Sequence, residues 1–165
     1  RRRGRIEHDV RGRARSRVLY TDGARFRLGE ADTMRAGTDI TIIAIGLMVE
    51  RALDAAAVLA NEGISARVLN MATVRPLDEA ALLAAARETG ALVTVEDATI
   101  LGGLGGAVAE LTADQYPVFV RRVGVKDRFG ESGKPAEVKE VCELTPPFIR
   151  QAVEEVLRAK AQRAT

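Results

Sequence analysis

Short runs of consecutive apolar residues alternate along this chain with longer segments of helical periodicity. Buried strands are predicted at Asp39–Ile45, Ala66–Asn70, Ala91–Glu96 and Val118–Val123, because apolar runs of this length fit a sheet that is covered on both faces. The stretch Ala24–Glu30 instead alternates polar and apolar residues, as an edge strand does. The pattern therefore predicts a sheet whose first strand lies at an edge.

The segments between these runs place their apolar residues at helical spacing. Helices are expected over Met48–Asn61, Glu79–Glu88, Ala107–Gln115, Pro135–Glu143 and Pro147–Lys160. Glycines follow the first two helices and prolines open the last two, which is typical of helix ends.

Strands and helices alternate from residue 39 to the end of the last predicted strand, and this order is typical of a parallel sheet with helices on both faces. Right-handed crossovers connect parallel strands in such a sheet. Only the first strand lacks a crossover helix, so we expect it to pair antiparallel at an edge. The predicted fold is α/β: three α/β/α layers around a mostly parallel five-stranded sheet with one antiparallel edge strand.

Length and composition indicate one globular domain. The chain has 165 residues, of which 47% are hydrophobic and 29% charged. No apolar run approaches the roughly 20 residues that cross a bilayer, so no membrane association is expected. The single cysteine, Cys142, excludes an internal disulfide and fits a reducing compartment. We therefore expect a cytoplasmic protein.

Charge is concentrated in the first residues. Residues 1–17 hold eight arginines against Glu7 and Asp9, a net charge of +6, so the other 148 residues carry −4 of the overall +2. Such a run can bind nucleic acid through its phosphates, but no aromatic residues are interleaved to stack on bases. We interpret residues 1–20 as a basic arm and residues 21–165 as the folded domain.

The stretch VTVEDATILGGLGGAVAE, residues 93–110, is the main candidate site. The acidic pair Glu96 and Asp97 ends a predicted strand there, and Val108 occupies the third glycine position of the dinucleotide-binding pattern. Two interpretations stay open: a weak anion site at a helix N-terminus, or a tight corner near a neighbouring chain. Both involve the same four glycines, Gly102, Gly103, Gly105 and Gly106.

Other motifs offer little chemistry. The piece GESGKP, residues 130–135, lacks the Ser or Thr that follows lysine in a phosphate loop. The only histidine, His8, lies in the basic arm, so the domain contains no histidine-based triad. Asp127 belongs to the charged loop VKDRFGESG, which we interpret as a contact loop. We assign no catalytic, cofactor-binding or metal-binding residue.

Five passages in this order resemble the C-terminal domain of transketolase, most closely the form that is split into two subunits. They are GTDITIIAIGLMVERALDAA, GISARVLNMATVRPLD, ARETGALVTVEDATILGGLGGAVAE, RVGVKDRFGESG and ELTPPFIRQAVEEVL. The resemblance covers roughly residues 26–157 and implies the same mixed α/β fold. The family often has a histidine after the acidic pair, where this chain has Ala98.

The resemblance implies an activity that this chain does not perform alone. Transketolases transfer a two-carbon ketol unit between sugar phosphates, using thiamine diphosphate and Mg²⁺ held by two other domains. The C-terminal domain supports dimerisation, so the expected partner is an N-terminal transketolase section, in a homodimer or a heterotetramer. Residues 1–20 would then be the remnant of a preceding pyrimidine-binding domain, and the candidate site residues, Asp127 included, would lie near an interface.

Alternative functions are compatible with the same residues. The same domain architecture serves deoxyxylulose-phosphate synthase and the β subunits of 2-oxoacid dehydrogenases. A stand-alone regulatory module that binds a small anion at the glycine cluster is a different class of function. A nucleic-acid-binding protein led by the arginine arm is a third class.

Overall fold

The computed structural model describes residues 19–20, 26–130 and 132–163 of the chain. The strands in this part are β1 (Asp32–Arg35), β2 (Ile40–Ala44), β3 (Ala66–Asn70), β4 (Ala91–Thr99) and β5 (Phe119–Val125). The helices in the same part are α1 (Met48–Asn61), α2 (Glu79–Thr89), α3 (Leu104–Gln115), α4 (Pro135–Val141) and α5 (Pro146–Arg163).

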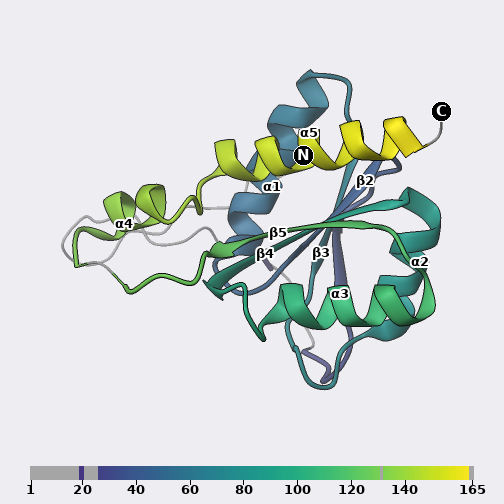
Figure 1. The fold of residues 1–165 in the computed structure, drawn as a ribbon, viewed down its shortest axis with the longest axis horizontal. Helices are drawn as coiled ribbons and strands as arrows, with labels where there is room; N and C mark the ends of the chain where they lie inside the picture. The colour runs from purple at the N-terminus through teal and green to yellow at the C-terminus, as the bar shows by residue number, and fades with distance from the viewer. Residues whose placement is uncertain (1–18, 21–25, 131, 164–165) are drawn as a thin grey trace.

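The strands form one sheet in the order β1-β3-β2-β4-β5, with helices on both faces (Figure 1). Helices α1 and α5 contribute to the apolar cluster on one face, and α2 and α3 to the cluster on the other. Helix α4 lies at the far end of a long excursion after β5 (Figure 1). The predicted three-layer α/β/α fold is confirmed.

The sheet is parallel except at one edge. Strands β2, β3, β4 and β5 pair in parallel, while β1 pairs antiparallel with β3 through partners such as Asp32 and Asn70. The predicted antiparallel edge strand is therefore present. Every strand except β1 ends at the same edge of the sheet, which we call the carboxyl edge.

The position predicted for the edge strand was wrong: β1 is not formed by Ala24–Glu30. Residues 21–25 lie outside the described part, and the residues after them form a turn. The amide of Gly29 donates to Thr73 Oγ1 (3.1 Å), and that of Ala31 donates to Asp78 Oδ2 (2.8 Å). Because side chains of the β3–α2 connection take these amides, the segment has no regular ladder, and pairing begins one residue later.

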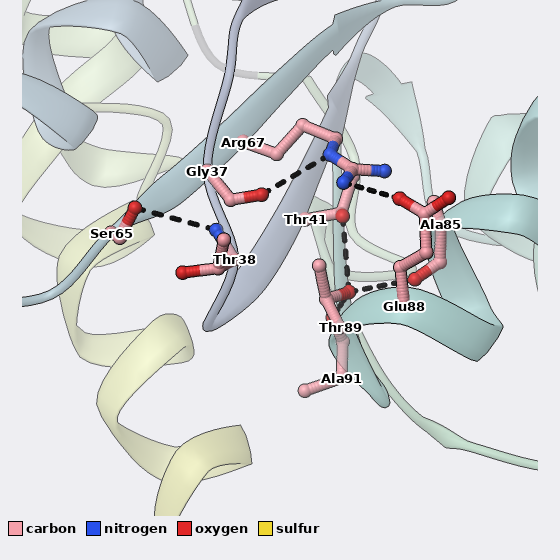
Figure 2. Close-up of polar contacts among 9 residues, drawn as sticks. All are labelled: Gly37, Thr38, Thr41, Ser65, Arg67, Ala85, Glu88, Thr89 and Ala91. Carbon is pink, nitrogen blue, oxygen red and sulfur yellow. Dashed lines mark hydrogen bonds and ion pairs between the residues drawn. The ribbon is translucent and has the colours of Figure 1, made fainter.

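Polar contacts close the opposite, amino end of the sheet, buried at Thr41 and Thr89 and exposed at Glu88 (Figure 2). The hydroxyl groups of Thr41 and Thr89 lie 3.1 Å apart, joining β2 to the end of α2. The Arg67 guanidinium on β3 donates to the Gly37 carbonyl (3.3 Å) and to Glu88 (2.5 Å). The hydrogen bond between Thr41 and Thr89 satisfies hydroxyl groups that would otherwise be costly to bury.

The position of Gly37 has no space for a side chain. A methyl group there would overlap the backbone of Ala66 and the amide nitrogen of Arg67. Since main-chain atoms cannot rotate away, Gly37→Ala is expected to lower the free energy of unfolding by about 2 kcal/mol. Chemical denaturation measures this, and Gly130→Ala serves as a comparison because open space surrounds that position and its φ is not positive. An unchanged denaturation midpoint for Gly37→Ala would contradict this packing.

Candidate functional site

The glycine corner between β4 and α3 is organised around one buried carboxylate. Glu96 is 2% exposed, and its Oε2 accepts a hydrogen bond from the amide of Leu104 (2.9 Å). Its Oε1 accepts a second from the amide of Gly105 (2.8 Å). Amides of a helix N-terminus have no partner within the helix, so an acidic group there is stabilised by both hydrogen bonds and the helix dipole. Glu96 therefore caps α3 from eight residues upstream.

This cap changes what the corner can bind. A phosphate at the start of α3 would need the same amides that already hold Glu96. It would also approach a buried carboxylate of the same charge sign. The geometry supports a closed corner more than an anion site, and the anion interpretation stays a prediction.

The neighbouring acidic residue faces the other way. Asp97 is exposed while Glu96 is buried, as expected for successive residues of a strand. The two carboxylates therefore do not form an acid–base pair. Asp127 follows β5 at the same carboxyl edge, is exposed, and has a positive φ of 27°.

The four glycines of the corner differ in what they permit. A methyl group at Gly103 would overlap the Glu96 carboxylate, and one at Gly105 would lie 2.7 Å from Thr94 Oγ1. Gly102 has a φ of 71°, which side chains rarely adopt, although open space surrounds it. Gly106 has ordinary φ and nothing within 4 Å. Gly103 and Gly105 are thus needed because a side chain would not fit there, and Gly102 is needed because of its backbone conformation.

The sequence pattern did not reveal the cap, the position of Arg122 or the exposure of Phe129. Arg122 lies with its side chain against Gly105 and donates to the Ile100 carbonyl (3.0 Å), which ties β5 to the β4–α3 connection. Phe129, in the loop after β5, is 97% exposed. The sequence analysis interprets VKDRFGESG as a contact loop, and an aromatic residue in such a loop was the signal that could have identified Phe129.

Tyr20 lies at the end of the carboxyl edge formed by β1 and β3. Its hydroxyl donates to Asp32 Oδ2 (2.7 Å) and accepts from Asn70 Nδ2 (2.7 Å). Burial raises the pKa of Tyr20 above its ordinary value of 10.0, the hydrogen bond and charge of Asp32 add to this, and the bond from Asn70 opposes it. These two hydrogen bonds hold Tyr20 against the start of β1 and the end of β3, and we call them the Tyr20 anchor.

Asp32→Asn is expected to lower the pKa of Tyr20, because it removes the charge that disfavours the phenolate. Phenolate absorbance followed against pH measures this in a Tyr116→Phe background, which leaves Tyr20 as the chain's only tyrosine. An unchanged titration would contradict the Tyr20 anchor.

The raised pKa of Tyr20 also makes stability depend on pH. Because the folded pKa lies above the unfolded one, the contribution of Tyr20 to stability is full below pH 10.0 and disappears as pH rises through the folded pKa.

A cofactor site would need ligands that the described residues do not bring together. Among them, no three His, Cys, Asp or Glu side chains gather closely enough to hold a metal ion. The helix N-terminus that would suit a diphosphate is capped by Glu96. The described residues thus do not fit thiamine diphosphate with its metal. None of the described helices is long and apolar enough to cross a membrane.

Comparison with known proteins gives a consistent result. Residues 29–149 match the family model described as transketolase, C-terminal domain. The chain is 49% identical over 142 residues to the 6-deoxy-6-sulfo-D-fructose transketolase subunit SqwH of Clostridium sp. (strain MSTE9), covering 86% of this chain and 44% of that protein. It is 40% identical over 148 residues to the 1-deoxy-D-xylulose-5-phosphate synthase of Symbiobacterium thermophilum, covering 89% of this chain and 23% of that protein.

Solved structures agree with these matches. A split gene transketolase, solved as an inactive beta4 tetramer, superimposes with a TM-score of 0.85 at 42% identity and covers 89% of this chain and 48% of that one. Transketolase from Leishmania mexicana shares the fold, with a TM-score of 0.61 at 20% identity. The chain spans less than half the length of each of these four proteins.

Proposed function

Since the chain belongs to the transketolase C-terminal domain family, we propose that it is the C-terminal section of a thiamine-diphosphate-dependent transketolase. The complete enzyme transfers a two-carbon ketol unit between sugar phosphates. This section supports assembly of the enzyme and does not react itself. Residues 21–165 form the supporting domain, and residues 1–20 are a basic arm or the remnant of a preceding pyrimidine-binding domain. A cytoplasmic location is part of the same proposal.

The buried cap on α3 carries this proposal. Open α/β sheets bind ligands at the carboxyl ends of their strands, where helix N-termini offer free amides. In this domain the amides of Leu104 and Gly105 are held by Glu96. The chain thus closes the position at which an α/β domain of this kind would bind a phosphate.

The cofactor and partners belong to the rest of the enzyme in this proposal. Thiamine diphosphate would supply the carbanion chemistry of ketol transfer when bound, together with Mg²⁺, in domains outside this chain. Split transketolase subunits among the relatives support a partner that carries those domains. The assembly would be a homodimer or a heterotetramer.

Deoxyxylulose-phosphate synthase is the second candidate for the complete enzyme. The 40% identity to a 1-deoxy-D-xylulose-5-phosphate synthase favours it, because that relative matches 89% of this chain. The two candidates differ in product. An assay of the complete enzyme for ketol transfer between sugar phosphates, beside one for deoxyxylulose phosphate formation, distinguishes them.

Calorimetric titration with thiamine diphosphate and Mg²⁺ tests the proposed role. We expect no heat of binding to the chain alone, and both binding and ketol transfer after a matching N-terminal transketolase section is added. Saturable binding to the isolated chain would contradict the supporting role. Binding without ketol transfer in the mixture would contradict the proposed reaction.

A further inference from the structure

Exposed apolar side chains gather at the carboxyl edge of the sheet. Nine large apolar side chains are exposed in the described part of the chain, and six of them lie on segments at this edge. We call these six the carboxyl-edge patch. They are Tyr20, Phe26, Leu28, Leu47, Leu101 and Phe129.

The topology brings these segments together although they are far apart in the sequence. Leu47, Leu101 and Phe129 follow β2, β4 and β5, which are adjacent parallel strands. The amide of Ile100 donates to the Val125 carbonyl (3.1 Å), so the connections after β4 and β5 lie side by side. Five strands at a spacing of about 4.8 Å span about 20 Å, which is the length of this edge.

The remaining patch residues reach the same edge from the antiparallel side. Strand β1 begins beside Asn70, the last residue of β3, so the segment before β1 also lies at the carboxyl edge. The hydrogen bond from Gly29 to Thr73, in the connection after β3, holds that segment in place. Phe26 and Leu28 are both 67% exposed there.

The distribution of exposed apolar residues is the informative observation. Single exposed apolar residues are ordinary on protein surfaces, and Val58, Tyr116 and Val141 are of this kind. Concentration of such residues at one place marks an interaction site. Both faces of the sheet are covered by helices, and two thirds of the large exposed apolar side chains of the described residues lie on segments at the carboxyl edge.

The chemistry of the edge favours a protein over a small ligand. The carboxyl edge of an open α/β sheet usually presents polar groups to a ligand. Here the amides at the start of α3 are occupied by Glu96, and exposed aliphatic and aromatic side chains lie at the edge together with the carboxylates of Asp97 and Asp127. Phe129 is 97% exposed, and aromatic side chains are enriched at the centre of protein interfaces.

We propose that the carboxyl-edge patch docks the transketolase section that precedes this domain in its relatives. The proposal rests on the proposed function, in which such a section exists. This chain spans 44% of the SqwH subunit and 48% of the split gene transketolase chain, and in a C-terminal domain the remainder lies upstream. The described chain also enters at this edge, where Tyr20 is anchored to Asp32 and Asn70.

Binding between this chain and a separately produced N-terminal transketolase section tests the surface. The double variant Leu101→Ser/Phe129→Ser is compared with Val58→Ser, which removes an exposed apolar side chain from α1. We expect the double variant to raise the dissociation constant at least about tenfold, as loss of interface anchors does, and the control to stay within about twofold. Circular dichroism checks that all variants fold, which is the expected result because the substituted side chains are exposed.

Each outcome separates the two proposals. If the double variant binds the section as tightly as the unmodified chain does, the docking surface is wrong and the proposed function stands. If the unmodified chain binds no transketolase section, the proposed function fails and the docking proposal fails with it. Sedimentation of the chain alone adds a third outcome. Self-association that Leu101→Ser/Phe129→Ser abolishes would make a second copy the occupant and overturn the proposal.

Discussion

Replacement of Ile43 by aspartate is expected to unfold the domain. Ile43 is fully buried in β2, the central strand, and belongs to the apolar cluster beneath α2 and α3. A carboxyl group there meets mostly apolar side chains, and the one hydroxyl beside it among the described residues, that of Thr94 on the neighbouring strand, cannot replace the water lost on burial. The expected loss is about 5 kcal/mol, since burying a polar group without a partner costs about that much. Domains of this size have a total stability of about 5–15 kcal/mol.

Urea denaturation followed by circular dichroism measures this loss. Val58→Asp is the matched control, because it introduces the same carboxylate at a position on α1 that is 44% exposed. The control is expected to lose less than about 1 kcal/mol, as surface substitutions do. If Ile43→Asp and Val58→Asp unfold at the same urea concentration, the assignment of β2 as the buried centre is wrong.

The central elements could be predicted from the sequence because local pattern and burial agree there. Helix α1 (Met48–Asn61) and strand β3 (Ala66–Asn70) have the predicted bounds. In α1 the buried positions recur at helical spacing, and Gly63 follows the end of the helix. In β2 every residue is buried, as expected for a strand with helices on both faces.

Contacts between distant segments could not be predicted in this way. The alternation in Ala24–Glu30 is a local signal, yet the residues that decide the fate of this segment, Thr73 and Asp78, lie more than forty residues away. Helix α3 begins at Leu104, three residues before the predicted start at Ala107. Glycines at the start of a helix disfavour it, so the pattern placed the start too late.

The missing information at the start of α3 is the position of Glu96. Local capping motifs place the acidic residue within the first turn of the helix. Glu96 instead lies on β4 and reaches the amides of Leu104 and Gly105 because the chain reverses between them. A cap supplied by the preceding strand leaves no fixed spacing in the sequence. The same reversal requires Gly103, where a side chain would collide with the cap.

Gly103→Ala is therefore expected to release the cap of α3. The backbone of Gly103 is extended, with φ −94° and ψ −157°, so alanine fits the conformation and only the contact changes. Its methyl group would overlap Glu96 Oε2 and force the carboxylate away from both amides. Hydrogen bonds to a charged group contribute about 1.5–3 kcal/mol each, so we expect a loss of about 3 kcal/mol in the free energy of unfolding.

Gly106→Ala separates this effect from the general effect of alanine in a helix. Nothing lies within 4 Å of a methyl group at Gly106, and alanine favours a helix over glycine by about 1 kcal/mol. That variant is expected to keep or raise the stability, while Gly103→Ala also speeds hydrogen exchange at the amides of Leu104 and Gly105. If both variants shift the denaturation midpoint equally, Glu96 does not hold the helix. The corner would then be open to an anion, as the sequence alone allowed.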